Sequence, residues 1–204
     1  MRVAKSVITY RGAVEGKQEI LYFEHLQNLI NESSTFKRRV NFKFKDSNGG
    51  SPSDIVKTAR IYSSMENTIV AVFDYDFKDK DFINAINTCD KNNIIPAFSI
   101  PNFDLFLILH KELCYKQIIS KDNYEKDLKK VFNLDNDCDI KSEETIKKIL
   151  SQITLDDVKN ALRNAAIINK RSKENNKIIT KDVYEQPYLS INYFIEKVFD
   201  EINS

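Results

Sequence analysis

The stretch TIVAVFDYD, residues 68–76, decides the fold of this chain. The run from Thr68 to Phe73 carries no charge, which is typical of a strand buried on both faces in the middle of a parallel sheet. Asp74 and Asp76 follow at once, where the carboxyl end of such a strand would reach solvent. Ligand sites of α/β folds lie at that edge of the sheet, so we expect a site here.

Short β-branched or aromatic runs alternate with helical patterns on both sides of this strand. Before it, the pattern predicts a strand within residues 6–14, a helix over 17–31, a strand over 40–45 and a helix from about 51 to 65. After it, a helical pattern around residues 82–89 leads to a strand over 94–100, where Pro96 favours an edge or irregular strand. This alternation is typical of an α/β fold with a mainly parallel sheet and flanking helices.

The second half of the chain has a different character. It is rich in Lys, Asp, Asn and Ile, and helical patterns fit residues 121–133, 142–151, 154–169 and 188–202. Thr154 and Asp157 fit a capping box, and the polar stretch 169–181 predicts a loop. We therefore predict an α/β core over residues 1–112 and a mainly helical C-terminal region over 113–204 that packs on it.

The composition indicates a soluble protein of the cytoplasm. The chain has 204 residues, 42% hydrophobic and 30% charged, and its net charge of +1 predicts no large field of one sign. Three cysteines lie far apart and fit neither a disulfide framework nor a zinc site. We find no signal-peptide pattern and no apolar segment long enough to span a membrane, so no membrane contact is expected.

Three carboxylates form a candidate metal site. Glu15 stands between Gly12 and Gly16 at the start of a predicted helix, and Asp74 and Asp76 point to one face because they are two residues apart. Oxygen ligands without a histidine or cysteine cluster favour Mg²⁺, or Mn²⁺, over zinc. Each motif alone also has a structural interpretation, since carboxylates often cap helices or favour the helix dipole.

Three motifs in order resemble the RloB-like family, a branch of the Toprim superfamily. They are VEGKQEILYFEHL, IVAVFDYD and SIPNFDLFLILHKE, and they span about the first 112 residues. ALRNA (161–165) and QPYLSINYFIEKV (186–198) are weaker similarities to the C-terminal part of that family. The chain departs from the family pattern at Asp104, where Glu is usual, and at Phe106, where Trp is usual. The shorter reach of Asp104 puts a direct metal role for that residue in doubt.

The resemblance implies a Toprim-like (Rossmann-like) fold in which Glu15, Asp74 and Asp76 hold Mg²⁺ for phosphodiester chemistry. It implies a nuclease acting on DNA or RNA, tRNA included, in bacterial anti-phage defence by abortive infection. Its implied partners are nucleic acid and an AAA- or ABC-type ATPase, and a homo-oligomer stays open. The alternatives are an effector or sensor controlled by the ATPase without activity of its own, and a primase-like nucleotidyl transferase. No Walker-type phosphate loop is present.

Several further residues are expected near this site. Lys17 is placed to contact a phosphate at the helix N-terminus, with Gly16 leaving room. Glu19 is either a further metal ligand or a surface residue of the helix. Ser99, Asn102 and Asp104 are candidates to line the cleft. For His110 we prefer a charged cap at the end of its helix over catalysis.

Two basic clusters are candidate contacts to nucleic acid. They occupy residues 36–45 and 163–181, and salt-sensitive phosphate contacts are predicted for Lys37, Arg38, Arg39, Arg163, Lys170, Arg171 and Lys173. The alternative is that these side chains only solubilise the surface.

Overall fold

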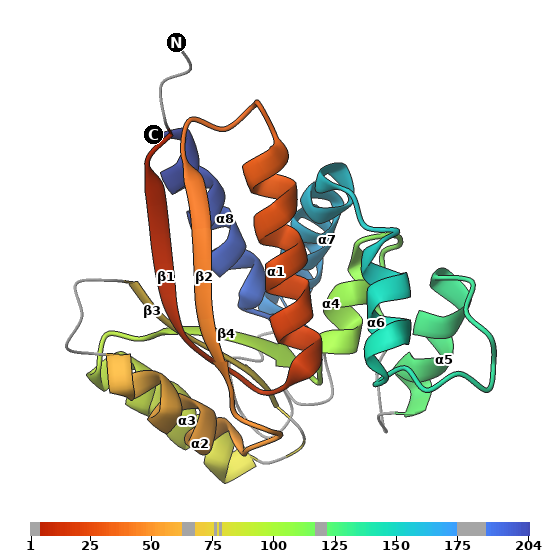
Figure 1. Ribbon diagram of the computed structural model, residues 1–204. Helices are drawn as coiled ribbons and strands as arrows, with labels where there is room; N and C mark the ends of the chain where they lie inside the picture. The colour runs from red at the N-terminus through yellow and green to blue at the C-terminus, as the bar shows by residue number, and fades with distance from the viewer. Residues whose placement is uncertain (1–4, 63–67, 76, 78, 117–121, 175–186) are drawn as a thin grey trace.

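The computed structural model describes residues 5–62, 68–75, 77, 79–116, 122–174 and 187–204, and Figure 1 shows their arrangement. The N-terminal half contains β1 (Val7–Val14), α1 (Lys17–Glu32), β2 (Arg39–Asp46), α2 (Pro52–Ala59), β3 (Thr68–Asp74), α3 (Asp79–Lys91), β4 (Ile95–Ile100) and α4 (Phe103–Leu109). The C-terminal half contains α5 (Asp122–Val131), α6 (Glu143–Leu150), α7 (Leu155–Glu174), β5 (Tyr188–Leu189) and α8 (Ile191–Asn203).

The strands form one mostly parallel sheet in the order β2-β1-β3-β4-β5. β3 lies in the middle, parallel to β1 and to β4, which confirms the buried central strand predicted from TIVAVF. β5 is antiparallel and pairs only with Ser99 and Ile100 at the end of β4. The α/β class with a mainly parallel sheet and flanking helices is therefore confirmed.

Alternate residues of β3 face two separate cores. Val70 and Val72 pack in the larger cluster with α1, α4 and α8, whereas Ala71 and Phe73 pack in the smaller cluster under α2 and α3. Figure 1 shows these two helices on one side of the sheet and α1 and α8 on the other. A strand buried on both faces needs apolar residues at every position, which explains the continuous apolar run.

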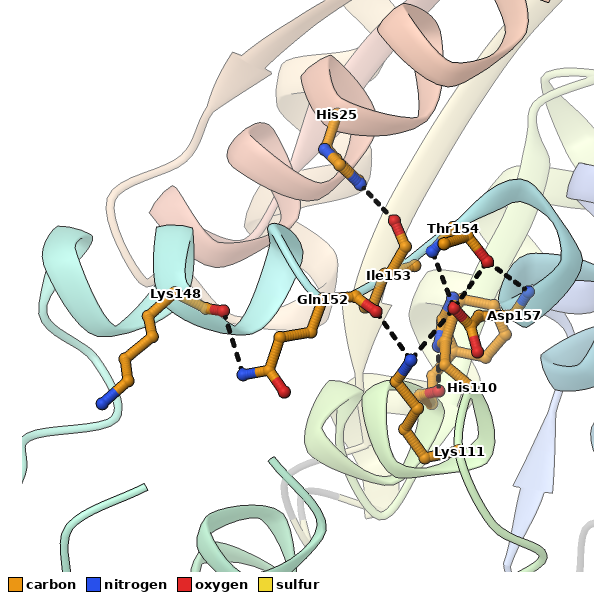
Figure 2. Close-up of polar contacts among 9 residues, drawn as sticks. His25, His110, Lys111, Lys148, Gln152, Ile153, Thr154 and Asp157 are labelled. Carbon is orange, nitrogen blue, oxygen red and sulfur yellow. Dashed lines mark hydrogen bonds and ion pairs between the residues drawn. The ribbon is translucent and has the colours of Figure 1, made fainter. Parts of the chain in front are cut away.

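A polar joint ties the C-terminal helices to α1 and α4 (Figure 2). Lys111 Nζ lies 2.6 Å from the Gln152 carbonyl oxygen and 3.0 Å from Asp157 Oδ2. His25 Nε2 donates to the Ile153 carbonyl at 2.8 Å. The predicted capping box is confirmed, because Thr154 N–H donates to Asp157 Oδ2 at 2.8 Å and Asp157 N–H donates to Thr154 Oγ1 at 3.3 Å.

Some element predictions were wrong at their ends. The loop predicted over residues 169–181 is wrong at its start, because α7 continues to Glu174 with Ser172 buried and hydrogen-bonded to the Pro187 carbonyl at 2.8 Å, and residues 175–181 lie outside the described residues. The second helix ends at Ala59, before a short 3-10 turn over Arg60–Tyr62. β5 begins where a helix was predicted.

Pro96 lies at a local edge of the sheet, as predicted, although β4 as a whole has a strand on each side. β5 covers only the far end of β4, so Pro96 is outside the stretch that β5 pairs with. The Pro96 carbonyl instead accepts a hydrogen bond from Ser190 Oγ at 2.7 Å. A proline without a donor is therefore tolerated where no strand needs one. The division of the chain at residue 112 stays a prediction.

Gly12 is the glycine that the packing of the sheet requires. It lies in β1 opposite Val70 of β3, and a Cβ built on it would stand 1.7 Å from the Val70 carbonyl oxygen. A backbone atom at that distance cannot move aside without separating the two strands. At Gly16 the nearest atom to such a Cβ is Glu19 Oε2 at 3.8 Å, so the chain itself does not require a glycine there.

We predict that Gly12→Ala lowers the free energy of unfolding by at least about 3 kcal/mol, because the added methyl forces β1 away from β3. Gly16→Ala is the matched control and should cost less than about 1 kcal/mol, since only the capping preference changes. Urea unfolding followed by circular dichroism measures both values. Equal stability of the two variants would contradict this account.

Candidate active site

Glu15 and Asp74 meet at the carboxyl end of the sheet. β1 and β3 are paired neighbours, with Val14 opposite Val72, so the residues that follow them leave the sheet side by side. The Asp74 N–H donates to Glu15 Oε2 at 3.3 Å, and Asp74 Oδ2 accepts from the Phe103 N–H at 3.0 Å. The Glu15 carboxylate is thereby held against the backbone of a residue 59 positions away in sequence, and both acidic residues line one cavity.

A cavity of about 410 Å³ opens beside these two carboxylates. The N-terminal half contributes most of its lining, from the start of α1, the ends of the strands and the start of α4. The C-terminal half closes another part of it with residues before and within α5 and α6. The lining residues are Glu15, Gly16, Lys17, Gln18, Glu19, Gly49, Asp74, Asn102, Asp104, Glu125, Ile140, Lys141 and Ile146.

Glu19 is buried and, together with Glu15 and Asp74, forms an acidic group beside the cavity. It is only 6% exposed, so the alternative of a surface helix residue is wrong. Burial, and next the nearby charge of Glu15, raise the pKa of the Glu19 carboxyl to about 8. Its Oε2 accepts the Gly16 N–H at 3.0 Å, which also caps the first turn of α1.

The three residues predicted to line the cleft have different fates. Asn102 lines the cavity and is 6% exposed, and its buried Oδ1 has no hydrogen-bond partner among the residues that the structure describes. Asp104 also lines the cavity, and its Oδ1 accepts from Gln18 Nε2 at 3.1 Å. Ser99 was predicted wrongly: it is buried in β4 beside Asp74, and its carbonyl accepts the Tyr75 N–H at 3.1 Å.

The predicted metal site can be followed only in part. Asp76 lies outside the described residues, so its place in the site is not part of the structure. Among the residues that the structure does describe, no three His, Cys, Asp or Glu side chains are grouped so that they could hold a metal ion. Glu15 and Asp74, two of the three predicted ligands, both line the cavity, and the metal site stays a prediction.

Comparison with known proteins decides the family. The family model described as "RloB-like protein" matches residues 13–198, which is most of the chain. The chain belongs to the RloB-like family. Searches of curated proteins and of solved structures found no match. In this RloB-like chain, the matched region includes the acidic group and all the residues that line the cavity.

In this RloB-like chain, the Lys17 side chain forms an ion pair with Glu143, and this partner occupies the ammonium that was predicted to contact a phosphate. Its Nζ lies 3.2 Å from Glu143 Oε2, and the two side chains are 52% and 48% exposed. An ion pair that open to water contributes little to stability. Lys17 can therefore exchange this partner for another anion at small cost.

The basic cluster at residues 37–39 lies at the wrong end of the sheet for direct contact with the acidic group. Arg39 starts β2 opposite Val7, and the N–H groups of Lys37 and Arg38 donate to the Ile202 carbonyl, both at 3.1 Å. From Val7 to Val14 a strand advances about 23 Å. One phosphate cannot touch both places.

The second basic cluster lies nearer the carboxyl end of the sheet. Arg163, Lys170 and Arg171 are exposed on α7, and the end of that helix is fixed beside β5 by the Ser172 hydrogen bond to Pro187. The Arg171 guanidinium lies over the Tyr115 ring, 4.7 Å from its centroid. The side chain of Lys173 lies outside what the structure describes. Nucleic-acid contact by these residues stays a prediction.

Four cavity residues of the C-terminal half were missed by sequence reasoning. Glu125, Ile140, Lys141 and Ile146 belong to the C-terminal half, which carries no motif that points to a site. Their place depends on how α5 and α6 pack against the core, and helical periodicity alone does not give that packing.

No described helix of this RloB-like chain combines the length and the apolar character needed to cross a membrane.

His110 is a neutral core residue, so the predicted charged cap is wrong. It is fully buried, and burial lowers the pKa of its imidazole from 6.5 to about 4. Nδ1 lies 2.9 Å from the Phe106 carbonyl, which only accepts, so Nδ1 carries the proton. Nε2 then accepts the Tyr22 hydroxyl at 3.1 Å. Neither nitrogen is offered to the cavity.

We predict that His110 makes the fold sensitive to acid. A lowered folded-state pKa means that its stabilising contribution is complete above pH 6.5 and is lost as pH falls toward 4, by up to about 3 kcal/mol. In urea unfolding at both pH values, His110→Gln should show a smaller loss between them than the unmodified protein. His25→Gln controls for removal of an imidazole and should keep the full loss. Identical losses in all three proteins would rule this out.

Proposed function

We propose that this RloB-like protein is a Mg²⁺-dependent nuclease that cleaves phosphodiester bonds in DNA or RNA. The single observation that carries the proposal is the meeting of Glu15 and Asp74 at the carboxyl ends of two paired parallel strands, beside a cavity. The resemblance of the VEGKQE and VFDYD motifs to Toprim proteins supports a Toprim-like arrangement of this sheet. Anti-phage defence, tRNA as substrate, cytoplasmic location and an ATPase partner are further proposals that rest on the family alone.

The residues present fit a hard divalent cation. The donors that line the cavity are oxygens, which Mg²⁺ and Mn²⁺ prefer. Burial, and next the nearby charge of Glu15, raise the pKa of Glu19, and a cation bound beside both carboxyl groups would favour the ionised form of Glu19. Asn102 Oδ1 is a further oxygen that could bind a cation, because it is buried and accepts no hydrogen bond from any described residue. Glu15 and Asp74 would hold the ion, together with Asp76 from outside the described residues.

The metal, when bound, would neutralise charge on the phosphate and lower the pKa of a water nucleophile. The chain's own residues would do the remaining work. Asp74 Oδ2 accepts the Phe103 N–H, which helps to orient the carboxylate beside the cavity. Glu15 would either hold the metal or, as the alternative, take a proton from the attacking water, and Lys17 can bind the phosphate after leaving Glu143.

We predict that Mg²⁺ stabilises the folded protein. Binding to the native state alone adds about 2.7 kcal/mol at a hundredfold excess of Mg²⁺ over its Kd, so the unfolding temperature should rise when EDTA is replaced by MgCl₂. Glu15→Gln and Asp74→Asn should lose most of that rise. The matched control is Glu24→Gln, an exposed carboxylate on the same helix as Glu19, which should keep it. Equal rises in all variants would contradict a metal site at Glu15 and Asp74.

We predict that the purified protein cleaves nucleic acid only with a divalent metal. Plasmid, single-stranded DNA and total tRNA would be incubated with Mg²⁺, Mn²⁺ or EDTA and resolved by gel electrophoresis. Glu15→Gln and Asp74→Asn should lower the rate by at least about 100-fold, because a general base or metal ligand is removed. Glu24→Gln should not change it.

Cleavage that persists in EDTA, or in folded Glu15→Gln protein, would overturn the nuclease proposal. Mg²⁺ binding without cleavage of any of the three substrates would instead favour the effector controlled by a partner ATPase. Incorporation of nucleoside triphosphates into a primer would favour the nucleotidyl transferase.

A further inference from the structure

The cavity has a second wall, made by the connection between α5 and α6. Ile140 and Ile146 line the cavity and are buried in the larger core cluster, so this wall is part of the fold rather than a loose flap. α6 packs against α1, the helix that carries Lys17 and Glu19 (Figure 1). The two halves of the chain therefore enclose one site.

Lys141 stands on this wall with its backbone fixed on both sides. Its N–H donates to Asp139 Oδ1 at 2.9 Å, and Ser142 caps the next helix by accepting the Thr145 N–H at 3.2 Å. The turn before it is held by Lys129, whose Nζ donates to the Asn136 carbonyl at 2.8 Å. The Lys141 side chain is exposed, and across the described part of the chain no ion pair engages it.

More acidic than basic residues line the cavity, so a lysine on its wall would offset their repulsion of a polyanion. Two ammonium groups, Lys17 and Lys141, line the cavity together with four carboxylates, Glu15, Asp74, Asp104 and Glu125, and with the Glu19 carboxyl, whose raised pKa favours its neutral form. Lys17 is held by Glu143, which also binds Lys147 Nζ at 2.6 Å. A polyanion that approaches a carboxylate-lined cavity is repelled unless cations receive its phosphates.

We propose that Lys141 binds a phosphate of the nucleic-acid substrate. Glu143 weakens the binding of the substrate because it pairs with Lys17, whose ammonium could otherwise also bind a phosphate. The inference rests on the proposed function, since it names how the same site receives its substrate. Lys141 is a substrate-positioning residue, because its ammonium can meet a phosphate beside the carboxylates without taking part in proton transfer. Opposite effects are expected from the two positions: loss of Lys141 weakens binding, and loss of the Glu143 charge strengthens it.

The first test measures binding without cleavage. Fluorescein-labelled single-stranded DNA and RNA oligonucleotides are titrated with Glu15→Gln protein over a range of KCl concentrations, with fluorescence anisotropy as readout. Adding Lys141→Ala should weaken binding about tenfold at low salt. It should also reduce the dependence of log K on log[KCl] by about 0.7 to 1, the share of one phosphate contact.

Matched variants decide whether this effect is specific. Lys141→Arg should restore affinity and salt dependence, which a merely structural role would not produce. Lys148→Ala removes an exposed lysine of α6 that does not line the cavity, and should change binding less than twofold. Glu143→Gln should strengthen binding at least twofold. Unfolding temperatures confirm that all variants are folded.

The second test uses the protein with Glu15 intact. Lys141→Ala should raise KM for cleavage and leave kcat within twofold. If Lys141→Ala matches Lys148→Ala in binding and in KM, the inference is overturned while the nuclease proposal stands. If binding depends on Lys141 but no metal supports cleavage, the nuclease proposal fails and the phosphate contact stands. If no oligonucleotide binds at any salt concentration, the inference is overturned as well.

Discussion

Parallel pairing of β1 with β3 is the interaction on which the rest of this structure depends. These strands approach so closely at Gly12 that the Val70 carbonyl occupies the place of a side chain. The same register carries Glu15 to the Asp74 N–H. Slipping one strand by a single residue would turn its side chains to opposite faces and part the two carboxylates. The fold and the acidic group therefore have one cause.

The cavity concentrates features that oppose stability. Glu19 is buried next to Glu15, and a buried side-chain oxygen of Asn102 has no hydrogen-bond partner in the described part of the chain. Each feature costs free energy in a protein without a ligand, and the two apolar clusters on either side of the sheet must offset that cost. Such a cost is common where a protein binds a charged ligand, because the ligand supplies the missing interactions.

The sequence carried the architecture better than the boundaries of the site. The run from Thr68 to Phe73 specifies a central strand, because apolar residues at every position fit only burial on both faces. Glu15 and Asp74 could be predicted together, since parallel strands end at one edge. Lys141 could not be, because its place depends on tertiary packing of α6 against α1. His110 was misjudged because a helix end gives no information on burial, and burial removes the charge on which its predicted role depended.

The short helix α4 has a mechanical consequence. At its first residue, the Phe103 N–H grips the Asp74 carboxylate, and just beyond its last turn Lys111 is clamped to Gln152 and Asp157. Seven helical residues span about 10 Å, so α4 connects the acidic group to the joint shown in Figure 2 over that short distance. The hydrogen bond that orients Asp74 and the contacts that join the C-terminal helices to the core are therefore made at the two ends of one short helix.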